Sequence, residues 1–434
     1  LANTTGASIV AIGANAYDQA DTESHNIAIG NDAMHGAVAG GEYNIAIGSN
    51  TLDALTSGDN NTALGYNAAT SLTTSNDNVF IGSGVGQAAT TPAGNTVVGA
   101  YAIQSGTFTG NNNVVIGKLA GYNMTSADAN IIIGEDAGLE QTTADNNVLI
   151  GQGAGAAITT GADNIFIGTA AGDHHDAETD NLGIGKNALG GNIAGGEYNV
   201  AVGNVTLDAL TSADSCVAVG HGAGSAVTTG HNNTFIGTTA GDAVTTSGNN
   251  VIIGTASDHA AAGGVDGAVV IGFNVIAASS GTRYITLGYQ GDLTYIAPGS
   301  SSWSGTSDLR LKENINDHTL GLDFVNDLRP VTYNWKKEKD VDESLHYYKE
   351  DSDKRVNSDD EEIILKHGFI AQEVKQIIDD NNLDSNCFGL WSKQDDGTQG
   401  LAEGELTPIL VKAVQELSAQ VTTLQQELKT IKGE

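Results

Sequence analysis

Residues 113–117 read Asn-Val-Val-Ile-Gly, and the word returns as Asn-Ile-Ile-Ile-Gly at residues 130–134 and Asn-Val-Leu-Ile-Gly at residues 147–151. A short β-branched run bounded by Asn and Gly predicts a strand followed by a turn. The glycine that closes the word recurs seventeen times between Gly13 and Gly288, at intervals of 17 or 18 residues except for a last interval of 16. This repeat therefore decides the fold of residues 1–290.

The repeat length indicates a β-solenoid or β-roll. Seventeen residues are too few for a helical-hairpin repeat but suit one coil, because coils stack at the spacing of β-strands. Seventeen coils at ~4.8 Å each predict a rod about 80 Å long. Asn stands four residues before the glycine in 13 of the 17 copies. We expect these side chains to form ladders along the rod, each bonding turn backbone or its stacked neighbour.

The strand word is apolar on both of its faces. The residues three and one before the glycine share a face and are mostly Ile, Val or Leu. The residue between them points the other way, yet it is also apolar, as at Phe80, Val115 and Phe166. A single-chain solenoid with a solvated outer wall would carry polar residues at this middle position. Burial of both faces implies a partner, so we predict a homotrimer of identical rods.

The composition excludes several classes of partner. The net charge is −34, with 3 Lys and Arg against 25 Asp and Glu in residues 1–306, and 15 against 27 in the remainder. Phosphate binding needs clustered basic residues, so nucleic acid and anionic membranes are not expected partners. No run of 18 apolar residues occurs, so no membrane insertion is expected. Cys216 and Cys387 fall in different modules, which implies no disulfide framework.

Three kinds of polar cluster in the array have both a functional and a structural interpretation. His174-His175, between two aspartates, either binds a metal or lies in a solvated loop insertion, and we favour the loop. The paired threonines resemble the threonine rows of ice-binding solenoids. A flat ice-binding face needs Thr-x-Thr with both hydroxyls on one side, whereas adjacent hydroxyls point to opposite sides, so ice binding is not favoured. Loop acids could bind Ca²⁺, but the nine-residue calcium-roll motif is absent and turn chemistry is favoured. The acids in question are Asp128, Asp145 and Asp163. Beyond this Ca²⁺ alternative, no cofactor is expected.

The period ends in a stretch rich in Ser and Gly, residues 291–306, which we interpret as a neck or linker. The next residues are Ser307-Asp308-Leu309-Arg310-Leu311-Lys312, followed by mixed charges, aromatics and helical patterns. We therefore expect a repetitive shaft over residues 1–290, the neck over 291–306, and an α+β module over 307–434. Within that module, residues 367–380 predict a helix.

The end of the module carries a heptad pattern over residues 406–432. Seven apolar residues alternate at intervals of four and three, which predicts a short coiled coil. A trimeric helical clamp of this kind would hold three chains in register while a slow, non-local β-rod forms. The seam residues are Leu410, Val414, Leu417, Val421, Leu424, Leu428 and Ile431.

Two resemblances extend this interpretation. The strand word resembles the NxAIG repeats of trimeric autotransporter adhesin heads, which are left-handed β-rolls, and similar repeats of phage tail-fibre proteins. The words SDLRLKENI (307–315), LRPVTYNW (328–335), HGFIAQEV (367–374) and LTPILVKAVQEL (406–417) resemble the intramolecular chaperone, or auto-processing, domain of endosialidase-type tail spikes and other phage fibres. The same domain occurs in myelin regulatory factor proteins. The segment from Lys336 to Lys366 departs from the family, and we expect an exposed insertion there.

The second resemblance implies self-cleavage between Thr306 and Ser307. It implies Ser307 as the nucleophile and Lys312 as the general base, with Asp308 and Arg310 orienting the loop by ion pairing. A serine hydroxyl is a poor nucleophile without a nearby base. A lysine amine can be that base only when desolvation lowers its pKa far below the free value, which we expect only after the trimer has packed. The alternative makes Ser307 a helix N-cap and Lys312 a surface residue.

The sequence thus predicts a trimeric phage tail fibre or tail spike, located on the virion tail and assembled in the host cytoplasm. Its expected partners are two further copies of the chain, the virion tail or baseplate, and a host cell-surface receptor, expected to be a glycan. The alternatives are a bacterial surface adhesin with the same rod and a tail spike that degrades glycans. The only enzymatic activity that the sequence supports is a single-turnover autoproteolysis.

Overall fold

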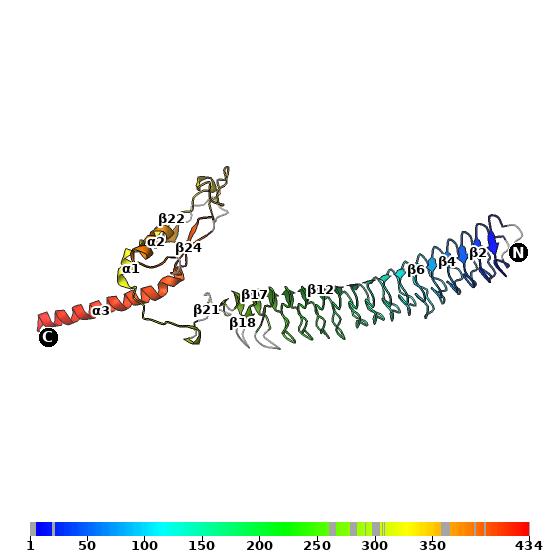
Figure 1. The fold of residues 1–434 in the computed structure, drawn as a ribbon, viewed down its shortest axis with the longest axis horizontal. Helices are drawn as coiled ribbons and strands as arrows, with labels where there is room; N and C mark the ends of the chain where they lie inside the picture. The colour runs from blue at the N-terminus through cyan, green and yellow to red at the C-terminus, as the bar shows by residue number, and fades with distance from the viewer. Residues whose placement is uncertain are drawn as a thin grey trace. The chain divides into compact units, whose positions relative to one another are not determined.

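The computed structural model describes residues 6–19, 22–259, 266–277, 284–290, 292–296, 304–305, 307, 309–356, 365–385, 388–394 and 396–433. The chain divides into two compact units, Leu1–Ser307 and Asp308–Glu434. The first is a long β-solenoid and the second combines short strands with helices (Figure 1). The predicted mainly β fold with a repeat of about 17 residues is confirmed.

Each coil of the solenoid contributes one short strand to a single sheet (Figure 1). Successive strands pair in parallel and in register, so that Val114 faces Ile131, for example. The strands are β1 (Val10–Ile12), β2 (Ile27–Ile29), β3 (Ile45–Ile47), β4 (Thr62–Leu64), β5 (Val79–Ile81), β6 (Thr96–Val98), β7 (Val114–Ile116), β8 (Ile131–Ile133), β9 (Val148–Ile150), β10 (Ile165–Ile167), β11 (Leu182–Ile184), β12 (Val200–Val202), β13 (Val217–Val219), β14 (Thr234–Ile236), β15 (Val251–Ile253), β17 (Val269–Phe273) and β19 (Ile285–Tyr289).

The C-terminal end of the solenoid departs from this pattern. The short strands β16 (Asp258–His259) and β18 (Ile276–Ala277) form a separate parallel pair. After β19, the strand β20 (Asp292–Ile296) pairs antiparallel with it, and β21 (Ser304–Gly305) pairs antiparallel with β20. The described residues of the segment expected to be a neck therefore continue the sheet of the rod.

The predicted asparagine ladder is present inside the rod. The Oδ1 atom of Asn95 accepts a hydrogen bond from the backbone N–H of Asn113 in the next coil, at 2.9 Å. The Nδ2 atom of Asn113 donates to the carbonyl oxygen of Ala127, at 2.8 Å. Both amides are buried, so each side chain satisfies backbone groups that would otherwise lack a partner. Cys216 stands at the Asn position of its coil and carries no amide, so the ladder continues there only through its backbone N–H, which donates to Asn199 Oδ1 at 3.0 Å.

The glycine that closes each word is required by the stacking of the coils. Gly117 has a φ of 144°, and a Cβ atom added there would lie 2.2 Å from the carbonyl oxygen of Gly134. Gly134 stands in the same relation to Gly151, at 2.3 Å. No larger residue fits between coils that approach this closely. The column of glycines is therefore a steric consequence of the coil spacing.

Two positions of the coil supply large side chains to the core of the rod. They are the middle residue of the strand word and the residue six positions later. Phe166 fills the interior from β10, and a Cβ atom added at Gly172 would lie 2.5 Å from its ring. One coil later the pattern is inverted, because Gly183 is paired with Leu189, which is fully buried. Leu189 adopts a left-handed backbone with a φ of 55°. In these two coils the large core side chain thus comes from one position or the other, which keeps the core filled.

The expectation that the middle residue of each word lies on the outer wall of the coil is wrong. The middle residue of each word after the first, as in Val115 and Ile132, is buried. The flanking residues, such as Ile116 and Ile131, lie on the outer face and are 38% and 39% exposed. The reason is that the turn residues after each strand supply the rest of the core, so a three-residue strand needs only one inward side chain. Both faces are nevertheless apolar, as the sequence indicated.

The second unit is a small α+β module with its own core. Its elements are η1 (Leu309–Leu311), α1 (Leu322–Asp327), β22 (Val331–Tyr333), η2 (Glu338–Asp340), β23 (Lys366–Gly368), α2 (Ala371–Asp380), β24 (Trp391–Lys393), β25 (Gln399–Leu401), η3 (Glu403–Glu405) and α3 (Leu406–Lys432). Residues from α1, α2, β24 and α3 form the core, including Phe324, Ile378 and Ile409. The helix predicted over 367–380 begins only at Ala371, because residues 366–368 pair with β22.

Candidate functional site

The two residues expected to carry out self-cleavage lie close to the division between the units. Ser307 is the last residue of the first unit, and Lys312 belongs to the second. Both are exposed, as is Arg310. The turn η1 lies between them and is closed by the N–H of Lys312, which donates to the carbonyl of Leu309 at 3.2 Å. Thr306 and Asp308 lie outside the described residues, and the pairing of Ser307 with Lys312 remains a prediction.

The stretch that follows Ser307 exposes apolar side chains. Every residue from 309 to 319 is exposed. Leu309, Leu311 and Ile315 are 71%, 73% and 60% exposed, respectively. Three large apolar residues within seven positions form a surface that a partner would be expected to cover. The sequence did not lead us to expect this exposed apolar surface. The signal for it was present, since Leu309, Leu311 and Ile315 alternate with Arg, Lys and Glu.

The C-terminal helix α3 has one apolar stripe buried in its own module and a second one exposed. Leu406, Ile409 and Ala413 pack against the core of the module. Glu416 ties the helix to α1, because its Oε2 atom accepts a hydrogen bond from the N–H of Leu322 at 2.8 Å. The heptad residues face away from that core, with 45% to 81% of each side chain exposed. These are Leu410, Val414, Leu417, Val421, Leu424, Leu428 and Ile431.

The outer face of the rod carries a third exposed apolar surface. From β1 to β19, the residues on either side of the buried middle position are aliphatic in most coils. Val10, Leu64, Ile165 and Ile236 are among the more exposed. Because the coils stack in register, these side chains form a continuous strip along the sheet. Such a strip is uncommon on a surface that stays in contact with water.

The histidine pair lies differently from the expected solvated loop. His174 is exposed, and its Nδ1 atom lies 2.9 Å from an oxygen of Asp173. His175 is fully buried, with its ring centroid 4.6 Å from that of Phe166. Burial lowers the pKa of the His175 imidazole to about 3. The favoured interpretation was therefore right for His174 and wrong for His175, because that position of the coil points into the core, as at Leu72 and Ile158.

The remaining polar clusters of the array serve the stacking of coils. Asp145 accepts a hydrogen bond from the N–H of Asp128 at 2.7 Å, and Asp128 likewise accepts from the N–H of Asn111 at 2.5 Å. Thr228 donates its hydroxyl proton to the carbonyl of Thr245 at 3.2 Å. Among the described residues, no three His, Cys, Asp or Glu are grouped so that they could hold a metal ion. The Ca²⁺ alternative therefore gains no support from this geometry.

Comparisons with known proteins find one family match, which covers the first part of the second unit. Residues 307–383 match the model of the family described as the chaperone of endosialidase, which is less than a fifth of the chain. No curated protein and no solved structure matches the chain. In the described part of the chain, no helix has the length and apolar character needed to cross a membrane. The match and the β-solenoid rod together fit a tail fibre or tail spike with a C-terminal intramolecular chaperone, and the family implies trimeric assembly.

Proposed function

We propose that this chain is a phage tail fibre or tail-spike protein that attaches the virion to a host-cell receptor and is matured by self-cleavage. Three copies assemble through the C-terminal module, the rods then pack along their apolar strips, and the bond between Thr306 and Ser307 is cut. The observation that carries the proposal is that the chaperone match follows, in the sequence, a rod whose outer strand face is apolar.

Trimer formation is supported by apolar surfaces that a single chain leaves exposed. They are the strip on the rod, the stretch around Leu309 and Leu311, and the heptad seam of α3. Burying such surfaces gains roughly 25 cal/mol per Å² of apolar area. Side chains such as Leu417 and Leu424 make this gain only when identical helices lie alongside. A three-stranded coil would cover the seam, and a three-rod shaft would cover the strip.

Self-cleavage needs the chemistry of Ser307 and Lys312. In the proposed step, the Lys312 amine takes the proton from the Ser307 hydroxyl, and Oγ attacks the carbonyl carbon of Thr306. The bond from that carbon to the Ser307 nitrogen breaks as the nitrogen takes up a proton, which leaves an ester. Water then hydrolyses the ester to a Thr306 carboxylate and a free Ser307 amine and hydroxyl. The exposure of both side chains in the single chain supports a reaction that waits for partner copies to exclude water.

Mass measurement on purified wild-type chain and on Ser307→Ala and Lys312→Ala variants tests the cleavage. The wild type should yield two fragments that meet between residues 306 and 307, whereas both variants should yield one uncut chain of 44.3 kDa. Asn316→Ala is a matched control, since Asn316 lies in the same exposed stretch, and it should be cut like the wild type. A fragment beginning at residue 307 from either active-residue variant would refute the assignment.

A further inference from the structure

Two hollows lie side by side on the C-terminal module. The first has a volume of about 470 Å³ and the second about 400 Å³. Trp335, Gln372 and Gln399 line both, so the hollows form one continuous groove that passes over the Trp335 side chain. The combined size lies in the range of small-molecule binding sites. We infer that this groove, called the Trp335 groove below, binds a neutral oligosaccharide.

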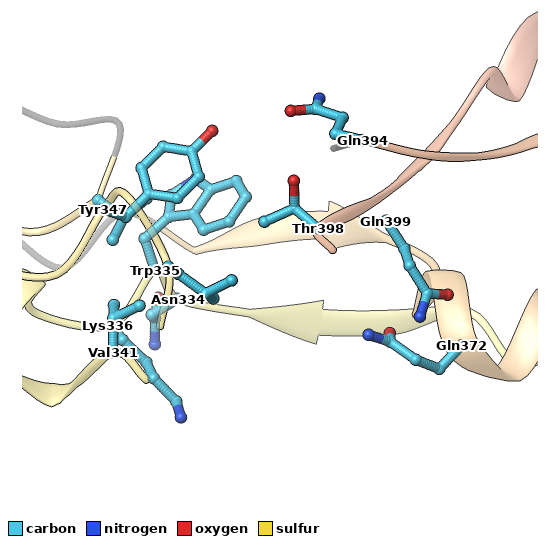
Figure 2. Close-up of a pocket in the computed structure, with 11 residues that line it drawn as sticks. Asn334, Trp335, Lys336, Val341, Tyr347, Gln372, Gln394, Thr398 and Gln399 are labelled. Carbon is cyan, nitrogen blue, oxygen red and sulfur yellow. The ribbon is translucent and has the colours of Figure 1, made fainter. Parts of the chain in front are cut away.

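The segment that departs from the chaperone family builds one wall of the groove. Figure 2 shows the rings of Trp335 and Tyr347 on one side and the amides of Gln372 and Gln399 across from them. Tyr347 comes from the segment between Lys336 and Lys366, which was expected to be an exposed insertion. More than half of the described residues of this segment are exposed, as expected, and the N–H of Val356 donates to the carbonyl of Lys336 at 2.9 Å, which closes the segment on itself.

Further polar contacts hold this wall in place. His346, next to Tyr347, makes a hydrogen bond to Asp396 in the turn between β24 and β25. Asp396 also accepts hydrogen bonds from the N–H of Thr398 at 2.9 Å and from its hydroxyl at 2.6 Å. The hydroxyl of Thr398 is the main reason that the pKa of Asp396 is lowered to about 2. The tyrosine is thereby fixed beside Thr398, which also lines the groove.

The amide across the groove is oriented before any ligand binds. The indole N–H of Trp391 donates to Oε1 of Gln399 at 2.8 Å. An indole nitrogen can only donate, so this bond assigns the oxygen of Gln399 to Trp391 and leaves its NH₂ group for other partners. Gln372 is presented on the first turn of α2 and is exposed. Two amides thus offer donors and acceptors toward the space in front of the aromatic rings.

This combination of groups fits the chemistry of a sugar. A pyranose ring has a face of C–H groups, which packs on aromatic rings, and a rim of hydroxyls, which both donate and accept hydrogen bonds. Tyr333 and Phe369 extend the aromatic lining into the second hollow, so more than one sugar unit has a surface to contact. Phe369, Ala371 and Leu401 line the second hollow and also pack against the core of the module, so this part of the groove is supported by that core.

The charge of the groove selects neutral over anionic sugars. Lys336 is the charged residue that lines the first hollow, and Glu403 is the one that lines the second, so the lining charges cancel. The module around them is acidic, with 15 Lys and Arg against 27 Asp and Glu in residues 307–434. A carboxylated or sulfated sugar would be repelled by this surface. The use of the groove for attachment rests on the proposed function, but sugar binding itself does not.

Titration of the purified full chain with neutral hexasaccharides tests the inference. Cellohexaose, maltohexaose and chitohexaose are the probes, with an oligogalacturonate as the anionic comparison, and binding is followed by calorimetry. At least one neutral probe should bind with a Kd at or below about 1 mM. Trp335→Ala should weaken that binding by about tenfold or more, and Gln372→Ala by about fivefold. Gln376→Ala, one turn further along α2 and outside the groove, should leave it unchanged.

Native mass and cleavage are measured on the same samples, so a failure of the proposed function is seen separately from a failure of sugar binding. Gln372→Ala replaces an exposed side chain and keeps the test valid if Trp335→Ala does not fold. The inference is overturned if no neutral probe binds at about 10 mM, or if binding survives both substitutions. Preferential binding of the oligogalacturonate also overturns it. A drop in oligomeric mass caused by Gln372→Ala, without sugar binding, would instead make the groove a contact between copies.

Discussion

The rod and the C-terminal module stabilise themselves in different ways. Each coil of the rod hydrogen-bonds the next through its backbone, its Asn ladder and its sheet, so a single chain already pairs the backbone groups and the ladder amides of the interior. The module has a small core and leaves the seam residues and the stretch around Leu309 in water. The interior of the rod is therefore complete within one chain, whereas the outer strip of the rod, the seam and the stretch around Leu309 are covered only when partners are present.

The largest effect should come from breaking the seam. Replacing Leu417 and Leu424 by Asp would place charges in the middle of the coiled coil, where each would lose its hydration without a counter-ion. We expect loss of the trimer in native mass spectrometry and, with it, loss of the cut before Ser307. Gln426→Asp adds one negative charge to the same helix outside the seam and should change neither result. A trimer that survives the double substitution would show that the rod alone assembles the protein.

The rod should respond locally to changes in its core. Phe166→Ala removes a fully buried ring and should cost about 3–5 kcal/mol of the free energy of unfolding. Adding Gly172→Leu should recover a large part of this loss, because the pairs Ala46 with Leu52 and Gly183 with Leu189 already use that arrangement. Chemical denaturation measures both values.

If the double variant is no more stable than Phe166→Ala, a large side chain at position 172 does not replace the packing that Phe166 provides. Hydrogen exchange of the coils on either side gives a second readout. Protection should fall near β10 and not at the ends of the rod, since each coil contacts only its neighbours.

An effect of similar size should build up gradually on acidification. The pKa of His175 is about 3 in the folded chain against an ordinary value of 6.5, so the unfolded chain binds a proton that the folded chain refuses. Stability should therefore be complete above pH 6.5 and fall by about 1.4 kcal/mol per pH unit between pH 6.5 and pH 3.

Comparing denaturation curves at several pH values isolates this contribution. His175→Leu should remove it, because Leu72 fills the equivalent place in an earlier coil. His174→Asn changes an exposed neighbour and should leave the pH dependence intact. Equal pH dependence in the wild type and in His175→Leu would show that other groups govern the acid response.

The sequence predicted the periodic part of the molecule well. The period, the parallel stacking and the Asn ladder follow from the spacing of Asn and Gly, because every coil must approach the next one closely at the Gly and bond to it through the Asn. The inward face was assigned wrongly, since alternation along three residues does not tell which side the turn residues will cover. His175 was misplaced for the same reason, as a polar residue at a core position looks like a loop residue when read alone.

The C-terminal module was predicted less completely. The heptad spacing located α3 and its seam, and the resemblance located the stretch beginning at Ser307. The Trp335 groove could not be predicted, because it joins three residues far apart in the sequence: Trp335 after β22, Gln372 on α2 and Gln399 on β25. The pairing of Ser307 with Lys312 depends in our account on three chains, which a single chain does not contain.

The mass of one folded wild-type preparation, measured under native and then denaturing conditions, tests the central claim most directly. We predict a native mass that corresponds to three copies and, after denaturation, two fragments that meet between residues 306 and 307. A native mass of one copy together with an uncut chain of 44.3 kDa would contradict both the assembly and the processing.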